Sequence, residues 1–229
     1  MKLSVFPFLL ILILTCHHHP HDHDHPHKNH SERHMHAQNF DELVKSFDSP
    51  EREKWQKPKE VIELIQTLHK GKKNSEIKLA DLGAGSGYFS FRLIEKDYRV
   101  IALDVNDKFI NVLQKKQNDN PKKNLIEIRK SEFSKSNLQK EEVDGVLSVN
   151  VYHHIENRST YLKELKSCIK KNGFVMIIDF KEGELPFGPP PNLKLPNQMI
   201  LSELKEAGFE IKIEDTLLPY QTIFIGINK

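Results

Sequence analysis

The chain has 229 residues, with 34 Lys+Arg against 32 Asp+Glu, a formal net charge of +2 and 38% hydrophobic residues. This profile is typical of one globular domain with a short extension, and it excludes collagen-like, mucin-like and polytopic membrane proteins. The charges do not gather into a basic stripe, so we expect no nucleic acid partner. Cys16 and Cys168 lie far apart in the sequence, which excludes a disulfide framework or a CxxC site.

The first sixteen residues have the pattern of an export signal. Lys2 precedes an uncharged stretch, residues 3–15, in which ten of thirteen residues are strongly apolar. As a helix, this stretch spans about 20 Å, less than the roughly 30 Å hydrocarbon core, so a secretory signal is favoured over a membrane-spanning helix. Its end, Ile13-Leu14-Thr15-Cys16, resembles the lipobox of bacterial lipoproteins, although Thr15 stands where Gly or Ala is usual. We expect a membrane tether in a bacterial cell envelope; the alternative is an uncleaved anchor that keeps the domain on the cytoplasmic face.

A histidine-rich tract follows, and we assign residues 17–39 to a disordered linker. Ten of the thirteen histidines fall between His17 and His36, interleaved with Asp and Pro. Such a sequence has no hydrophobic face to bury. Clustered imidazoles bind divalent zinc, nickel or copper loosely, without a spacing that selects one geometry. Loose metal binding and a plain solvated spacer both stay open, and we predict no defined metal site.

From Phe40 to Lys229, helical and strand patterns alternate. Helices are predicted at residues 40–47, 58–71, 88–96, 108–117, 158–171 and 197–207, and strands at residues 78–82, 99–105, 125–129, 143–149, 174–180, 209–214 and 222–227. This alternation predicts the α/β class, with a doubly wound, mostly parallel sheet and helices on both faces. Ligands of such sheets bind at the carboxyl ends of the strands, where the strand order reverses. The ends of the first, second and fourth strands are therefore the candidate site.

A glycine-rich turn follows the first strand, in Ala80-Asp81-Leu82-Gly83-Ala84-Gly85-Ser86-Gly87-Tyr88. A dinucleotide fold needs GxGxxG, but here the third glycine comes one residue early and Tyr88 stands in its place, which disfavours a nicotinamide dehydrogenase. Asp81 precedes the first glycine by two residues, and a carboxylate there suits a sulfonium or amino group better than a diphosphate. The plainer alternatives are an Asx turn for Asp81 and a helix N-cap for Asp104, which ends the second strand.

The stretch from Leu79 to Phe91 resembles motif I of the class I S-adenosylmethionine-dependent methyltransferases, small-molecule type, and the resemblance extends over roughly residues 40–229. It implies the Rossmann-like methyltransferase fold, with seven strands and the last strand antiparallel, and S-adenosylmethionine as the cofactor. In that family the acid at the position of Asp81 lies near the methionine amino group, and the acid at the position of Asp104 takes the ribose hydroxyls. Glu132 is a weak match to the acid near the adenine. The cofactor-binding residues that the resemblance implies are Asp81, Gly83, Gly85, Gly87, Tyr88, Asp104 and Asn150.

The segment after the fourth strand, Asn150-Val151-Tyr152-His153-His154, is similar to a short motif of many small-molecule methyltransferases. Asn150 stands where related sequences often carry Asp. Methyl transfer from a sulfonium is an in-line displacement that alignment and desolvation accelerate, and a base helps where the acceptor is a hydroxyl or a protonated amine. His153 and His154 are the candidate catalytic residues. In the alternative, one of them packs inward and the other caps the helix that starts near Asn157.

Two segments are candidates for the cover of an acceptor pocket. Residues 47–57, which contain Trp55, resemble the N-terminal cover of the family, and the Pro-rich residues 181–196 are suited to a stiff lid. Both are alternatively plain surface connections. The leading hypothesis is methyl transfer from S-adenosylmethionine to a small-molecule acceptor. The alternative is a metal-binding surface lipoprotein, in which the histidine-rich tract acts and the methyltransferase-like domain is not catalytic.

Overall fold

The structure is a computed structural model that describes residues 39–69 and 71–229. The predicted signal segment, residues 1–16, and all but the last residue of the predicted linker, residues 17–39, lie outside this range. Among the described residues, no helix combines the length and the apolar character that a membrane span requires.

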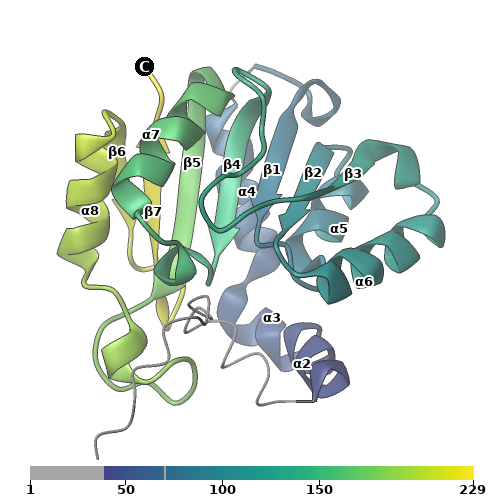
Figure 1. Cartoon of the computed structure of the whole chain (residues 1–229), viewed down its shortest axis with the longest axis horizontal. Coiled ribbons are helices and arrows are strands. Elements are labelled where there is room, and N and C mark those ends of the chain that lie inside the picture. The colour runs from purple at the N-terminus through teal and green to yellow at the C-terminus, as the bar shows by residue number, and fades with distance from the viewer. Residues whose placement is uncertain (1–38, 70) are drawn as a thin grey trace, which may run out of the picture. The chain divides into compact units, whose positions relative to one another are not determined.

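The centre of the domain is a seven-stranded sheet with the strand order β3-β2-β1-β4-β5-β7-β6 (Figure 1). Its strands are β1 Lys78–Leu82, β2 Arg99–Asp104, β3 Ile126–Lys130, β4 Val143–Val149, β5 Ile169–Phe180, β6 Glu210–Glu214 and β7 Gln221–Ile227. Strands β1 to β5 pair in parallel, whereas β7 is antiparallel to both β5 and β6. The predicted α/β fold, including the antiparallel last strand, is confirmed. The strand order reverses between β1 and β4, which is where a ligand site is expected.

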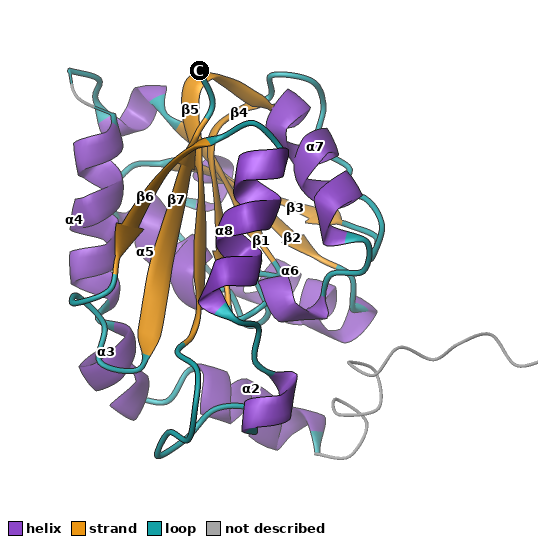
Figure 2. Ribbon diagram, turned by 90° about the vertical axis from the view of Figure 1, so that its left-hand side faces the viewer, coloured by secondary structure: helices purple, strands orange, loops and turns teal. Residues whose placement is uncertain are grey.

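Helices cover both faces of the sheet (Figure 2). They are α2 Phe40–Phe47, α3 Glu51–Gln56, α4 Pro58–Leu68, α5 Tyr88–Glu95, α6 Asp107–Asn118, α7 Arg158–Cys168 and α8 Asn197–Glu206. Buried residues of α4 and α5 pack on one face, and those of α7 and α8 pack on the other. All seven residues of β4 are buried, as expected for a central strand covered on both sides.

The largest differences from the predicted bounds, of three residues or more, are at the end of α7, the start of β5 and the end of α4. The predicted helix 158–171 ends at Cys168, because Ile169 already pairs with Val143 of β4 and begins β5 five residues earlier than predicted. A shift in the β4–β5 register at Val143/Gly145 accommodates this early start. The predicted helix 58–71 begins at Pro58 as expected but ends at Leu68.

Helix α3 was not predicted, because its sequence EREKWQ is short and carries no apolar period. It ends at Lys57, whose φ of 42° turns the chain directly into α4. Both α2 and α3 lie with the carboxyl ends of the parallel strands in Figure 1. The N-terminal segment therefore reaches the end of the sheet at which the candidate site lies.

Candidate cofactor and acceptor site

The glycine-rich turn joins the end of β1 to the start of α5, and its three glycines all have positive φ, between 56° and 83°. A Cβ at Gly83 would lie 2.4 Å from Val151, and one at Gly87 would lie 2.5 Å from Phe91. Any side chain at these two positions would collide with the domain itself. The atoms nearest to a Cβ at Gly85 would be those of the Phe47 ring, 3.2 Å away. Gly85 thus differs from the other two glycines, because its nearest neighbour is a side chain of α2.

Asp81 is buried at the carboxyl end of β1. Its Oδ2 accepts a 2.6 Å hydrogen bond from the hydroxyl of Ser90 in α5. Burial raises the pKa of Asp81 to about 6, and the opposing effects of Ser90 and of the positive charge of Arg52 do not cancel it. Desolvation disfavours the charged form of a carboxyl group. A cation beside Asp81 would therefore be strongly favoured.

Asp104 ends β2 and holds the glycine turn from its side. Its Oδ2 accepts the N–H of Gly85 at 2.8 Å, and its Oδ1 accepts the N–H of Asn106 at 2.9 Å. Burial raises the pKa of Asp104, and the backbone hydrogen bonds oppose that effect. The helix N-cap alternative is excluded at this position, because the side chain that caps α6 is Asn106, which accepts from Lys108 N–H at 2.9 Å. Asp104 presents a fixed, buried carboxylate beside the turn.

Tyr88, the residue in place of the third glycine, lies between two guanidinium groups. Arg52 of α3 and Arg92 of α5 lie 4.0 and 3.8 Å from the centre of its ring. Burial lowers the pKa of Arg52 to about 10, although Tyr88 and Asp81 both favour its charge. Arg52 is anchored by hydrogen bonds to the carbonyl of Phe47 and to the side chain of Gln56. The structure thus places a partly buried cation near Asp81, and this cation was not predicted from the sequence.

Asn150 follows β4 with a φ of 59° and belongs to a chain of amide side chains. Gln56 Nε2 donates to Gln221 Oε1 at 2.5 Å, and Gln221 Nε2 donates to Asn150 Oδ1. Gln56 and Gln221 are fully buried. This chain of amides connects α3, β7 and the end of β4, and it holds Asn150 in place. The residue after Asn150 is Val151, which packs on Gly83.

The two candidate catalytic histidines have different surroundings. Both lie in the short 3-10 helix η3, Tyr152–His154, after β4. His153 is turned inward, with 6% of its side chain exposed, and its Nδ1 lies 2.9 and 3.0 Å from the carboxylate oxygens of Asp179 at the end of β5. His154 is exposed, and its ring lies 4.0 Å from that of His153. The inward packing that the sequence left open therefore applies to His153.

Aromatic side chains meet at the same end of β5. The ring of Trp55 lies 6.0 Å from that of Phe180 and 4.8 Å from that of Phe187, and Phe187 lies 4.7 Å from Tyr220. Both predicted covers take part, since Trp55 belongs to α3 and Phe187 belongs to the Pro-rich loop 181–196. Glu132, by contrast, is exposed and forms an isolated bridge with Lys135.

Comparison with known proteins finds similarity to methyltransferases. Residues 80–177 match the sequence model of a family described as "Methyltransferase domain". This match covers less than half of the chain, so the similarity to a methyltransferase domain is shown for these residues. A ubiquinone biosynthesis O-methyltransferase from Pelagibacter ubique (strain HTCC1062) is 30% identical over 114 residues, which are 49% of this chain and 45% of that protein. The chain therefore spans less than half the length of this curated relative.

Solved structures agree on the fold. A SAM-dependent methyltransferase from Aquifex aeolicus has a TM-score of 0.73 and 24% identity, and the match covers 82% of this chain and 98% of that one. An S-adenosylmethionine-dependent methyltransferase from Mesorhizobium loti has a TM-score of 0.56 and 14% identity, over 71% of this chain and 96% of that one.

S-adenosylmethionine is the cofactor of this family, and the residues of the methyltransferase domain fit it. The cofactor carries an ammonium group, a sulfonium group and a pair of ribose hydroxyls. The desolvated carboxylate of Asp81 suits a cationic group, and the fixed carboxylate of Asp104 has oxygen lone pairs left for hydroxyl donors. A ligand would approach the backbone of Gly85 on the side where the ring of Phe47 lies. Asp81 and Asp104 would hold the cofactor, while Gly83 and Gly87 shape the turn.

Four residues of this candidate site were not predicted from the sequence. They are Arg52, Gln56, Asp179 and Gln221. Asp179 is the second-last residue of the buried strand β5, much as Asp104 ends β2, and this pattern is present in the sequence. Arg52 and Gln56 lie in a charged stretch without periodicity, and their roles depend on where α3 packs.

Proposed function

We propose that this chain transfers a methyl group from S-adenosylmethionine to a small-molecule acceptor. The observation that carries the proposal is the pair of buried carboxylates, Asp81 and Asp104, on either side of a glycine turn at the point where the strand order reverses. When bound, S-adenosylmethionine supplies an electrophilic methyl group, and its sulfur keeps the electron pair of the bond that breaks.

The residues of this chain align and desolvate the reactants. Asp81 neutralises an ammonium group, and Asp104 holds the glycine turn in register with its own strand end. Helices α2 and α3 close over the turn: Asp48 accepts from the hydroxyl of Ser86 at 2.7 Å, and Arg92 pairs with Glu53 at 2.8 Å. Exclusion of water strengthens every charge interaction inside such a site. His153 and His154 are proposed to act at the acceptor, beyond the end of β4.

Isothermal titration calorimetry of the full chain tests the proposal. We expect binding of S-adenosylmethionine and S-adenosylhomocysteine with one site per chain, and no binding of NAD⁺. A chain that binds NAD⁺ at this site, or that binds neither adenosyl compound, would contradict the proposal. The acceptor class is narrowed by measuring S-adenosylhomocysteine release with pools of small hydroxyl, amine and thiol compounds.

We further propose that the N-terminal segment attaches the chain to a membrane of the cell envelope. The apolar residues 3–15 and the lipobox-like Cys16 support this location. Cell fractionation together with palmitate labelling of wild type and Cys16→Ser tests it. Label that persists in Cys16→Ser, or a wild-type chain that stays in the soluble fraction, would contradict it.

A further inference from the structure

The pair of His153 and Asp179 joins the ends of two neighbouring parallel strands. Their side chains are 6% and 5% exposed, so the contact is almost entirely removed from solvent. Both oxygens of Asp179 lie within 3.0 Å of Nδ1, and Oδ1 also accepts the N–H of Phe180 at 2.9 Å. A carboxylate that accepts from Nδ1 keeps the proton on that nitrogen. The neutral imidazole then presents its lone pair at Nε2.

The elements around the pair are rigid. In η3, the hydroxyl of Tyr152 donates to Glu203 of α8 at 2.6 Å, and Arg158 of α7 pairs with the same carboxylate at 3.0 Å. Glu203 is thus engaged with these two partners. Among the described residues, both hydrogen bonds of His153 use Nδ1, and the charged or titratable neighbours that contact its ring are Asp179 and His154. Nε2 therefore has no hydrogen-bond partner in that part of the chain.

A row of aromatic side chains lies at the same end of the sheet as the His153–Asp179 pair. Phe180 follows Asp179 directly, Trp55 packs on Phe180, and Phe187 and Tyr220 continue the row. Phe187 is 37% exposed, so this row, which also includes Trp55 and Phe180, is open to a ligand at one side. Flat apolar side chains of this kind stack on planar aromatic molecules.

We propose that the His153–Asp179 pair takes the proton from an aromatic hydroxyl, so that the methyl acceptor is a phenol. The inference rests on the proposed function and names its acceptor class. As the phenol oxygen bonds to the methyl carbon, its proton passes to Nε2, and the electron pair of the broken carbon–sulfur bond stays on sulfur. His153 becomes an imidazolium that Asp179 stabilises, and it returns the proton to water after the methyl ether leaves. Asp179 is a positioning residue, because it acts through His153.

Proton affinities favour a phenol over an alkyl hydroxyl. An imidazolium ordinarily has a pKa of about 6.5 and a phenol one of about 10. An alkyl hydroxyl resembles water, and its pKa lies far above that of a phenol. A single imidazole is therefore matched to a phenol and far too weak for an alcohol.

The first experiment observes the histidine itself. Long-range ¹H–¹⁵N spectra of the full chain labelled with [¹⁵N]histidine, compared with those of His153→Asn, identify the His153 signals. We expect the neutral tautomer with its proton on Nδ1, and a shift of that proton to Nε2 in Asp179→Asn, whose side-chain amide can donate to Nδ1. The opposite tautomer in wild type, or the same tautomer in Asp179→Asn, would overturn the positioning role of Asp179.

The second experiment uses 4-nitrophenol, whose anion absorbs visible light, with saturating S-adenosylhomocysteine. We expect wild type to bind the phenol and to lower its half-ionisation pH by about one unit, a tenfold change in proton affinity. His153→Asn and Asp179→Asn should lose this shift, whereas Glu156→Gln, an exposed neighbour of η3, should keep it. Absence of phenol binding, or a shift that survives in His153→Asn, overturns the phenol assignment.

Calorimetry with S-adenosylhomocysteine separates the two proposals. If wild type and both variants of the pair bind it equally while the phenol shift is absent, the acceptor assignment fails and the proposed function stands. If wild type does not bind S-adenosylhomocysteine, the proposed function itself fails.

Discussion

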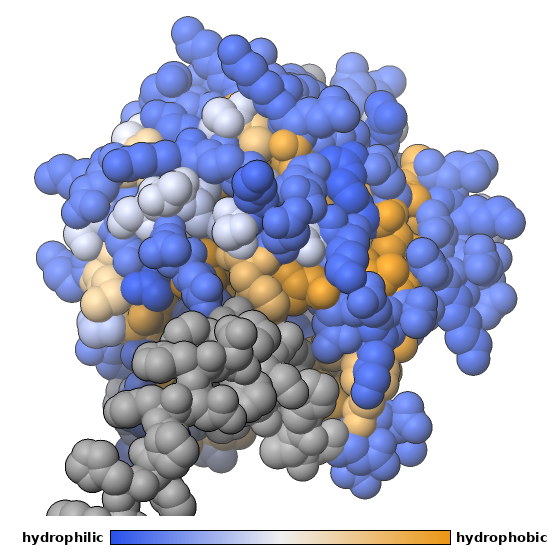
Figure 3. Space-filling model, viewed as in Figure 1, coloured by the Kyte–Doolittle hydropathy of each residue, from blue (hydrophilic) through white to orange (hydrophobic). Residues whose placement is uncertain are grey.

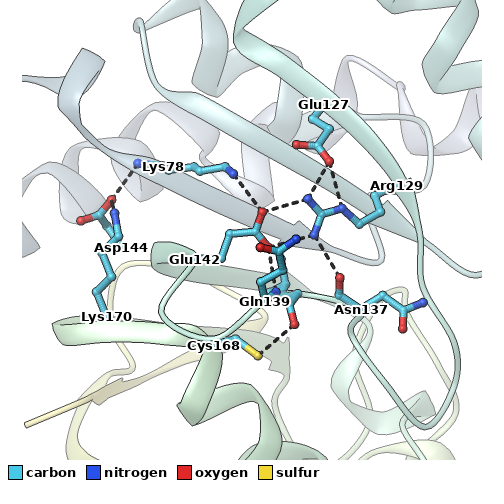
Figure 4. A network of polar contacts seen from close by, with 10 residues as sticks. Lys78, Glu127, Arg129, Asn137, Gln139, Glu142, Asp144, Cys168 and Lys170 are labelled. Carbon is cyan, nitrogen blue, oxygen red and sulfur yellow. Dashed lines mark hydrogen bonds and ion pairs between the residues drawn. The ribbon is translucent and has the colours of Figure 1, made fainter.

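Two groups of largely buried acids lie at different places on the same sheet, and their pKa values are shifted in opposite directions. Asp81 and Asp104 lie at the carboxyl ends of β1 and β2, and burial raises the pKa of both. Glu142 directly precedes β4 and Asp144 is the second residue of β4. Both belong to the network of polar contacts shown in Figure 4, and the pKa of both is lowered. The difference lies in their partners and not in burial, since the side chain of Asp144 is only 6% exposed.

The chain itself supplies the cations of the second group. Arg129 and Lys78 both reach Glu142, at 2.8 and 3.0 Å, and Arg129 also pairs with Glu127. For Asp144, burial alone would raise the pKa, but the N–H of Lys78 and the side chain of Lys170 outweigh it. A buried carboxylate with such partners stabilises the fold. One without a sufficient partner, such as Asp81, is a place for a cation that the protein does not contain.

Removal of the central acid of the network should have the largest effect. We expect Glu142→Ala to lower the free energy of unfolding by about 2 to 3 kcal/mol, because it leaves Lys78 partly buried without its partner and removes one of the two carboxylates that pair with Arg129. Urea denaturation measures this, with the exposed Lys140→Ala as control. Affinity for S-adenosylhomocysteine should stay unchanged. If Glu142→Ala were fully folded and still lost binding of S-adenosylhomocysteine, the two groups of acids would not be separate in function.

At the end of β2 we expect the opposite pattern, in which a substitution lowers the affinity for the ligand. Asp104→Asn keeps one oxygen acceptor but removes the charge, so we expect affinity for S-adenosylhomocysteine to fall about 30-fold, or about 2 kcal/mol. The matched control is Asp107→Asn, which changes an exposed carboxylate paired with Lys130. Equal affinities of Asp104→Asn and wild type in calorimetry would remove Asp104 from the cofactor site.

Removal of the Asp81 charge should raise the stability of the chain and lower its affinity for the cofactor. Because burial raises its pKa to about 6, its ionisation destabilises the folded chain at neutral pH. We expect Asp81→Asn to be more stable than wild type by about 1 to 2 kcal/mol at pH 7.5 without ligand, yet weaker in cofactor binding. A variant that is less stable at this pH would show that the charge of Asp81 is compensated inside the protein.

The pH dependence gives the sign of this effect. The folded state holds the Asp81 proton more tightly than the unfolded state, whose ordinary pKa is near 4. Between about pH 4 and pH 6 the folded state therefore binds more protons, and stability falls as the pH rises. The advantage of Asp81→Asn should vanish below about pH 4 and be complete above about pH 6. Glu142 behaves in the opposite way: its contribution is present above about pH 4.3 and is lost as the pH falls toward its folded value of about 2.

The smallest effect is expected where the N-terminal helices meet the turn. Lys116 donates to Asp48 at 2.7 Å and to the carbonyl of Ser86 at 2.8 Å, but both charged side chains are about one third exposed. Lys116→Ala should cost about 0.5 to 1 kcal/mol in stability. Affinity for S-adenosylhomocysteine should change less than threefold, since Phe47 still packs on Phe109. A larger loss of affinity would make this ion pair part of the cofactor site.

The sequence predicts the sheet well because its strands are buried runs separated by helix-length crossovers. It also indicates the turn and Asp81 and Asp104, since spacing alone places them at strand ends. It fails where a residue acts through distant packing. Arg52 reaches Tyr88 only because α3 lies over the turn, and Gln221 meets Gln56 across 165 residues of sequence.

The exposed surface carries less information than the site. The face viewed in Figure 3 is mostly hydrophilic, with hydrophobic areas between the charged side chains. This pattern is ordinary for a folded domain, much of whose accessible surface is apolar. The functional residues are recognised by burial and pairing, which only the folded arrangement reveals.

Helices α2 and α3 precede the stretch that the family model recognises, residues 80–177, yet Phe47, Arg52 and Gln56 all belong to or adjoin the site. A protein trimmed to the recognisable stretch would lose the ring beside Gly85, one of the two guanidinium groups on Tyr88 and the first amide of the chain to Asn150. The extent of the site is thus set by packing, and a unit that keeps the whole site begins well upstream of residue 80.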